Sequence, residues 1–211
     1  GAIHTQSYWL AANQANASEL MSLGASPDEI IDYLINNDVQ NNPSIRQYGV
    51  IDLVNGGRSA AFTGEGCFDY KNHILGDTYS IQGNILLGQD ILDQMEIGFL
   101  NTEGTLSDKL MAALQGANVP GADTRCLDDG ISSLSAFIRV ANPDDNSNFP
   151  NLNINVNNVN FAGYLIDPID SVQTLYDMWL YEQVLPGDVN QDLNIDVLDV
   201  VAIINFILGV S

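Results

Sequence analysis

The side chains with the clearest chemistry lie near the C-terminus, where acidic and amide residues alternate along one short loop. Counted from the first of them, positions 1, 3, 5, 7, 9 and 12 of this loop are Asp188, Asn190, Asp192, Asn194, Asp196 and Asp199. Calcium prefers roughly six to eight oxygen ligands, and side chains at alternating positions of a tight loop can converge on one ion. Without a cation the carboxylates would repel one another. The spacing therefore predicts bound Ca2+ as a cofactor, against the alternative of a polar turn without metal.

Residues 197–208, which follow the loop, are predicted to form a helix with a wide apolar face. The whole stretch 187–209, GDVNQDLNIDVLDVVAIINFILG, resembles a single type I dockerin repeat, in which an Asp at position 12 is usual. Leu193 replaces the glycine that is common at position 6 of calcium loops. The resemblance implies a cohesin-like or self-associating partner. Dockerins have two facing repeats and this chain has one, so either the second repeat is lost or left out of this chain, or the single apolar helix packs against the main domain or another chain's copy.

The composition limits the possible partners. The 211 residues include 27 acidic and 6 basic side chains, which gives a net charge of −21. Such a surface repels phosphate backbones, so nucleic acid is excluded as a partner. No apolar run reaches the roughly 18 residues that a membrane span requires. Cys67 and Cys126 lie in polar, glycine-rich surroundings and are predicted to form a disulfide in an oxidising compartment, the alternative being two separate buried thiols.

The order of elements predicts an α+β protein in which two helix pairs are separated by strands. Helices are expected over residues 13–23, from the capping box Ser26–Glu29 onward, and over 89–99, 106–115 and 167–182. Strands are expected over 46–53 and 58–63, joined by a tight turn at Asn55, and over 133–140 and 152–159. A break at 185–187 divides the chain into a main domain, residues 1–184, and a calcium-binding repeat, residues 185–211.

The main domain carries further motifs: HTQSYW (4–9), AAFTGEGC (60–67), SIQGNIL (80–86), PGADTRC (120–126) and SSLSAF (132–137). In these it resembles an uncharacterised family of secreted bacterial proteins that is grouped with the N-terminal-nucleophile (Ntn) hydrolases. The resemblance implies an αββα four-layer sandwich and an extracellular or cell-surface location. It also implies that a segment with the first strands and the terminal nucleophile precedes Gly1, either missing here or docked as a cleaved piece of the same precursor. Glycine has no side chain that could act as a nucleophile.

The candidate catalytic residues come from these family motifs. His4 and Thr5 would begin a strand at the edge of the cleft, and Gln82 and Asn84 flank a glycine where amide donors could form an oxyanion hole. Asp123 and Arg125 could form a charged pair beside them. For each, a structural role is the alternative: strand positions, a turn and a surface ion pair.

His73 is interpreted as a solvated residue without a metal role. Two functional hypotheses follow: a secreted Ntn-type amide-bond hydrolase tethered through its calcium module, or a non-catalytic extracellular scaffold or surface assembly protein.

Overall fold

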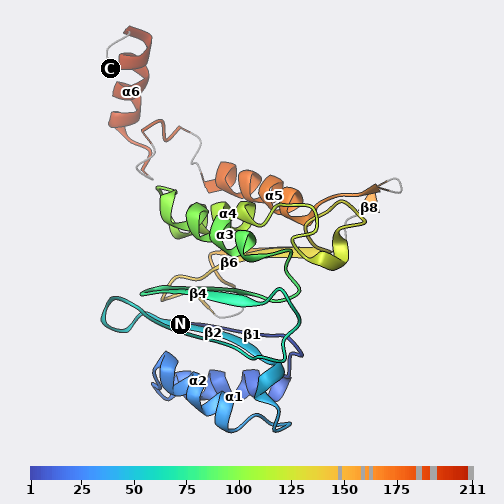
Figure 1. Ribbon diagram of the computed structural model, residues 1–211. Coiled ribbons are helices and arrows are strands. Elements are labelled where there is room, and N and C mark those ends of the chain that lie inside the picture. Colours follow the sequence, from blue (N-terminus) through green and yellow to red (C-terminus); the bar gives the residue numbers. More distant parts are fainter. Residues whose placement is uncertain (147–148, 158–159, 162–163, 184–186, 191–193, 209–211) are drawn as a thin grey trace.

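The protein has a mixed α+β fold, which confirms the predicted class. The computed structural model describes residues 1–146, 149–157, 160–161, 164–183, 187–190 and 194–208. Helices lie on the outside and β-strands lie between them (Figure 1). The helices α1 and α2 are on one side of the strands, and α3, α4 and α5 are on the other (Figure 1).

The first sheet is antiparallel, with the strand order β1-β2-β3. Its strands are β1 (Ala2–Gln6), β2 (Gln47–Asp52) and β3 (Arg58–Thr63), and α1 (Ala11–Ser22) and α2 (Pro27–Asn36) cover one of its faces. Short 3-10 turns η1 (Pro43–Ile45) and η2 (Val54–Gly56) precede and follow β2. The apolar side chains between helices and sheet form one core, made of Ala17, Ile30, Ile31, Leu34, Tyr48, Val50 and Ala60. Their burial is what holds the helix pair against the sheet.

Two local signals in this half are confirmed. The Ser26 hydroxyl accepts a hydrogen bond from the Glu29 backbone N–H while the Glu29 carboxylate accepts one from the Ser26 N–H, so the predicted capping box is formed. The turn between β2 and β3 contains Asn55, Gly56 and Gly57, all with positive φ. Glycine and asparagine tolerate that conformation best, which is why the turn forms here.

The remaining strands form two-stranded antiparallel pairs. They are β4 (Asn72–Gly76) with β5 (Tyr79–Gly83), β6 (Ser135–Val140) with β7 (Leu152–Asn157), and β8 (Asn160–Phe161) with β9 (Tyr164–Leu165). The alternation predicted for β7 is confirmed, since Leu152 and Val156 are buried while Asn153, Asn155 and Asn157 are exposed. Positions 158–159 of the predicted strand lie outside the described residues.

The second helical layer comprises α3 (Gln89–Asn101), α4 (Leu106–Gly116) and α5 (Pro168–Gln183), and η3 (Thr124–Cys126) lies between α4 and β6. These helices extend the predicted ranges by only one or two residues at their ends, the margin within which helix ends are ordinarily assigned. Side chains from α4, α5, β6 and β7 form a second core, made of Met111, Ala136, Ile138, Leu152, Val156, Ile169, Val172 and Tyr176. The last helix, α6 (Val197–Leu208), matches the predicted range 197–208. No described helix is both long and apolar enough to cross a membrane.

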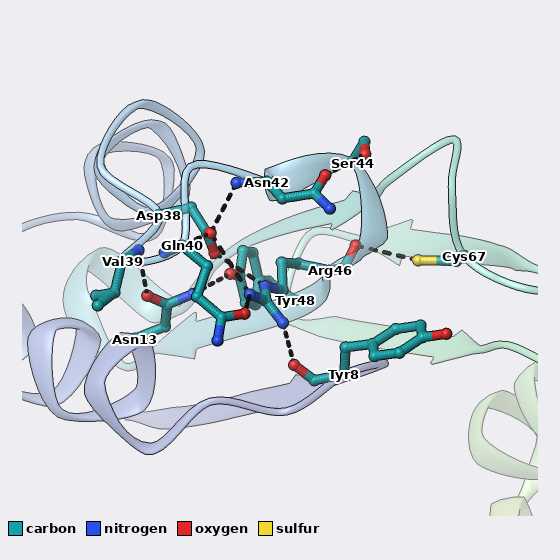
Figure 2. A network of polar contacts seen from close by, with 10 residues as sticks. All are labelled: Tyr8, Asn13, Asp38, Val39, Gln40, Asn42, Ser44, Arg46, Tyr48 and Cys67. Carbon is teal, nitrogen blue, oxygen red and sulfur yellow. Dashed lines mark hydrogen bonds and ion pairs between the residues drawn. The ribbon is translucent and has the colours of Figure 1, made fainter.

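A buried polar network joins the first sheet to α1 and to the chain after α2 (Figure 2). The Arg46 guanidinium, 2% exposed, donates from Nε to Asp38 Oδ2 at 2.9 Å, and the Asp38 side chain is fully buried. Asn13 Nδ2 donates to the same oxygen at 2.6 Å, and Arg46 Nη2 donates to Gln40 Oε1 at 2.8 Å. Arg46 Nη1 also donates to the backbone carbonyl of Tyr8. The network therefore fixes the segment that follows β1 against β2.

The predicted disulfide is wrong, because Cys67 and Cys126 are both free and buried. The Cys67 thiol donates to the backbone carbonyl of Arg46 at 3.3 Å (Figure 2). Burial raises the pKa of the Cys126 thiol. The alternative of two separate buried thiols holds, and the inference of an oxidising compartment from a disulfide falls with the bridge.

Candidate functional site

A row of polar side chains crosses the three strands of the first sheet near one end. Gln6 on β1 is opposite Gln47 on β2, and Gln47 is opposite Thr63 on β3. Opposed residues of antiparallel strands project to the same face, so these three side chains lie side by side. The alternation along β2 places Tyr48 and Val50 on the other face, in the first core. The row therefore faces away from α1 and α2.

Gln47 connects this row to the β4–β5 hairpin. Its side chain is fully buried, and its Nε2 lies within hydrogen-bonding distance of Thr63 Oγ1 at 2.9 Å. The same nitrogen approaches the backbone carbonyls of Asn72, on β4, at 3.0 Å and of Gly83, on β5, at 2.9 Å. A buried amide is stable only when it is hydrogen-bonded, and these contacts meet that requirement.

Three further side-chain amides gather around Gln47. We call Gln6, Gln47, Gln82 and Asn84 the inter-sheet amide cluster. Gln47 Oε1 accepts hydrogen bonds from Gln6 Nε2 at 2.7 Å and Asn84 Nδ2 at 3.1 Å. Gln82 packs against Gly49, where an added Cβ would lie 2.4 Å from its Oε1. Among the described residues, no hydrogen bond engages Gln82 Nε2, Gln6 Oε1 or Asn84 Oδ1. The cluster thus presents both donors and acceptors.

Thr63 and His73 form a hydroxyl–imidazole pair beside the cluster. Thr63 Oγ1 lies 2.9 Å from His73 Nδ1, and both residues are half-buried. Thr63 Oγ1 can accept from Gln47 Nε2 and donate its own hydrogen to His73 Nδ1 when the imidazole proton is on Nε2. Burial lowers the pKa of His73, so the ring is neutral at pH 7 and can accept it. His73 is opposite Gln82 in the hairpin register, which places the two side chains on one face.

The interpretation of His73 as simply solvated is therefore wrong. Both Thr63 and Gln47 were missed by sequence reasoning as well. One signal in the sequence could have indicated them. Gln47 and Thr63 are polar residues at the open end of the β2–β3 hairpin, and they become neighbours when the two strands pair.

The structure separates the predicted pair His4 and Thr5. His4 shares the face of Gln6, two residues along β1, and its ring stacks on Phe137 of β6 with centroids 6.0 Å apart. The surrounding protein lowers the pKa of His4 by desolvation, although the residue keeps an exposed edge. Thr5 projects to the opposite face, where its hydroxyl donates to Gln14 Oε1 on α1 at 2.7 Å. His4 therefore lies on the inter-sheet side and Thr5 does not.

Asp123 and Arg125 form the expected ion pair, with Arg125 Nε 2.9 Å from Asp123 Oδ1. Arg125 lowers the pKa of Asp123, but its own side chain is 69% exposed. The pair is attached to the chain beyond β5 through a β-bridge between Leu86 and Asp123. No described side-chain hydrogen bond links it to the amide cluster, so the alternative of a surface ion pair describes it better.

The described part of the calcium loop folds around Asp199, in the first turn of α6. Its carboxylate accepts hydrogen bonds from the backbone N–H groups of Val189 at 2.7 Å, Asn190 at 3.2 Å and Asp196 at 2.8 Å. Those bonds, the one from Asp196 foremost, lower the pKa of Asp199. Asp188 and Asp199 are both buried although they begin and end the loop.

Asp192 lies outside the described residues, and within them no three His, Cys, Asp or Glu side chains form a group that could hold a metal. Asp188 and Asp199, at loop positions 1 and 12, are the buried carboxylates among the described loop residues. These oxygens are the ligand type that calcium prefers.

A hollow of about 640 Å3 lies away from the amide cluster, at the other end of β3. It is lined by residues of the β2–β3 and β4–β5 turns, including Arg58 and Thr78. It brings together none of the predicted site residues.

Comparison with known proteins identifies a family whose function is unknown. Residues 1–161 match DUF1028, a family of unknown function. The chain is also similar to the crystal structure of protein SPO2555 from Silicibacter pomeroyi, which is described under the same family. That similarity has a TM-score of 0.64 and 23% sequence identity, and it covers 84% of this chain and 71% of the other. It supports a shared fold. No curated protein shows detectable similarity to the chain.

Proposed function

This chain belongs to DUF1028, a family of unknown function, and we propose that it is an exported bacterial amide-bond hydrolase with a calcium-binding, dockerin-like C-terminal module. The observation that carries the catalytic part is the inter-sheet amide cluster. Amide side chains that converge around the buried Gln47, with donors and acceptors left over on its half-buried neighbours, complement the C=O and N–H groups of an amide substrate.

Gln82 is the cluster member best suited to assist the reaction. Hydrolysis of an amide passes through a tetrahedral intermediate whose oxygen is negatively charged, and a fixed N–H donor stabilises that charge most where water is scarce. Gln82 Nε2 has no other hydrogen-bond acceptor among the described residues. Gly49 on β2 leaves room for the Gln82 side chain, because a Cβ at position 49 would displace the Gln82 amide.

The proposed fold is an Ntn-type αββα sandwich. The positions of α1 and α2 on one side of the strands, and of α3 to α5 on the other, support it. In this version of the proposal, a processed segment of the same precursor would pair with β1, which is an edge strand of its sheet. That segment would bring a terminal Thr, Ser or Cys, whose own α-amine acts as the base.

The catalytic proposal is tested with a panel of N-acylated amino acids and short peptides, followed by mass spectrometry of the products. The native chain should hydrolyse at least one member, and Gln82→Leu should lower kcat on the order of 10²-fold or more, the usual effect of losing an oxyanion donor. Gln173→Leu, on the outer helix α5, is the matched control and should behave as the native chain. Equal turnover by the two variants would refute the role given to the cluster.

For the C-terminal module, we propose that Asp188, Asn190, Asp192, Asn194, Asp196 and Asp199 bind one calcium ion, with Asn194 contributing its backbone carbonyl. The burial of Asp188 and Asp199 supports this, because two carboxylates out of water and close together need positive charge nearby. Calcium would supply that charge. Asp199 would also keep the ends of the loop together through its backbone hydrogen bonds.

Calorimetric titration of the full chain with calcium tests the module. We expect saturable binding that Asp199→Asn abolishes or weakens strongly, whereas Asp177→Asn, an exposed change on α5, leaves it intact. If the native chain shows no binding, or if both variants bind alike, the calcium assignment is incorrect.

A specific observation also favours the second candidate function, a non-catalytic scaffold or surface assembly protein. On α6 the apolar side chains of Val200, Ile203, Ile204 and Ile207 are all more than 40% exposed. Exposed apolar faces of this kind are usual at protein contacts. The partner would be cohesin-like or a second copy of the chain. Light scattering with and without calcium tests it: a scaffold associates when calcium is present, and it shows no turnover with any amide.

A further inference from the structure

We propose that Thr63 is a nucleophile of this protein and that His73 is its general base, so that the chain forms an acyl-enzyme at an internal hydroxyl. The inference rests on the proposed amide hydrolysis and places its nucleophile within the described residues. Thr63 lies in the AAFTGEGC motif and His73 lies outside the motifs, and neither is among the candidate catalytic residues predicted from the sequence.

The distance between the two side chains is the first argument. Thr63 Oγ1 and His73 Nδ1 are 2.9 Å apart, within the range required for proton transfer from a nucleophile to its base. They come from different elements, since Thr63 is the last residue of β3 and His73 is the second residue of β4. The pairing is therefore produced by the packing of the hairpin on the sheet.

The direction of the hydrogen bonds is the second argument. Gln47 Nε2 can only donate, and its two hydrogens are shared among Thr63 Oγ1 and the backbone carbonyls of both hairpin strands. In the tautomer that carries the imidazole proton on Nε2, Thr63 Oγ1 donates its own hydrogen to His73 Nδ1. In that tautomer the hydroxyl points toward the base before any substrate arrives, as an activated nucleophile requires.

Access and surroundings are the third argument. Both members of the pair are half-buried, unlike the fully buried Gln47 next to them, so part of the pair reaches the surface. The Gln82 side chain, directly opposite His73 in the hairpin, offers an uncommitted N–H donor on the same face. A nucleophile on β3, a base on β4 and an oxyanion donor on β5 are then contributed by three strands.

The reaction proceeds in two steps. Thr63 Oγ attacks the amide carbonyl carbon while its proton moves to His73 Nδ1; the C–N bond then breaks, and the leaving nitrogen takes that proton. Water next attacks the ester carbon, His73 accepts the water proton, and the C–Oγ bond breaks with the proton returned to Thr63. The products are a carboxylic acid and an amine, and no co-reactant other than water is consumed.

The test treats the purified full chain with 4-nitrophenyl acetate at pH 7, stops the reaction with acid, and locates the acetyl group by peptide mapping. We expect an ester on Thr63, with 4-nitrophenolate released. Thr63→Ser keeps the hydroxyl and should still be labelled, whereas Thr63→Val should not. His73→Gln can accept the hydroxyl hydrogen but is not a base, so its labelling should slow at least 10²-fold, the usual contribution of a general base.

Thr174→Val, an exposed change on α5, is the control and should leave labelling at Thr63 as in the native chain. The proposal is overturned if Thr63 stays unmodified in the native chain, or if His73→Gln labels it at the native rate. Labelling of the native chain and of Thr63→Ser shows by itself whether the hydroxyl at position 63 is acylated, so misfolding of the valine variant would not obscure the result.

The same experiment separates this inference from the proposed function. Labelling of Thr63 without cleavage of any amide in the panel would support the nucleophile and refute the amide-hydrolase assignment. Amide cleavage that persists unchanged in Thr63→Val would support the hydrolase and refute the internal nucleophile, leaving the terminal nucleophile of the Ntn version.

Discussion

The substitution Asp38→Asn should destabilise the protein severely, because it breaks the buried ion pair of Figure 2. The new amide is nearly the same size, but in either orientation its nitrogen would face donors in place of a carboxylate oxygen: Arg46 Nε and Asn13 Nδ2, or the backbone N–H groups of Gln40 and Asn42. The Arg46 side chain, 2% exposed, would then be a buried charge without its counter-charge. Removing one member of such a pair costs about 3–5 kcal/mol. That is a large share of the roughly 5–15 kcal/mol that stabilises an ordinary domain.

The measurement is urea and thermal unfolding at pH 7. A loss of this size should lower Tm on the order of 10 °C for a chain of this length. The control is Asp69→Asn, the same chemical change in an ion pair with Lys71 whose carboxylate side is 80% exposed. Water and salt screen that pair, so the control should unfold almost as the native chain does. If both variants unfold at the same denaturant concentration, the buried network does not carry the stability assigned to it.

The same site gives a pH dependence with a defined sign. Burial pushes the pKa of Asp38 upward, but hydrogen bonds from Arg46, Asn42 and Asn13 outweigh it and hold the pKa well below its usual range. A carboxylate with a depressed pKa stabilises the fold above its unfolded pKa of about 3.9, and that contribution is lost as the pH falls further. The native chain should therefore lose stability below about pH 4, and its advantage over Asp38→Asn should shrink there. A constant advantage down to pH 2 would contradict this.

Three further outcomes are expected. Gly64→Ala should lower the denaturation midpoint, since its Cβ would lie 2.1 Å from the backbone oxygen of Ser44; an unchanged midpoint would mean that this close approach is not required. Acylation of Thr63 should be constant near neutral pH and fall as the pH drops below the pKa of His73, which burial places under its ordinary value of about 6.5; a fall that begins above pH 7 would exclude His73 as the base. Ile204→Asp on α6 should abolish any calcium-dependent association seen by light scattering without altering amide turnover, and association that survives would assign it to another surface.

Local signals in the sequence were sufficient where one short segment determines its own structure. The capping box is formed by Ser26 and Glu29, which are only three residues apart in the sequence. The turn at Asn55 depends on the few residue types that tolerate positive φ. The exposed asparagines of β7 likewise follow from simple alternation. Such features could be predicted because the interactions that produce them are close in sequence.

The β4–β5 hairpin could not be predicted in the same way. Its strands are short, and from the sequence residues 82–84 are interpreted as an oxyanion hole or, alternatively, as a turn, not as the end of a strand. The strand forms because Ile81 is buried and because the backbone carbonyl of Gly83 meets Gln47. Those contacts are tertiary, so propensity alone does not indicate them.

The candidate site depended on the same kind of information. The motifs singled out Gln82 and Asn84, and the structure brings both to the amide cluster. Thr5 does not lie at the cluster, because adjacent residues of a strand such as His4 and Thr5 project to opposite faces of the sheet. The pair of Thr63 and His73 requires the register of β3 and the packing of a second hairpin upon it, and neither can be obtained from the spacing of the two residues.

The central claim, that the inter-sheet amides form a ligand site, is tested most directly by NMR titration of the 15N-labelled full chain with an N-acetylated amide. The account predicts that the side-chain NH2 resonances of Gln82, Gln6 and Asn84 shift together along one saturable curve, while that of Gln173 on α5 does not move. Shifts confined to side chains outside the cluster, such as Gln173, or no saturable shift in the cluster, would contradict it.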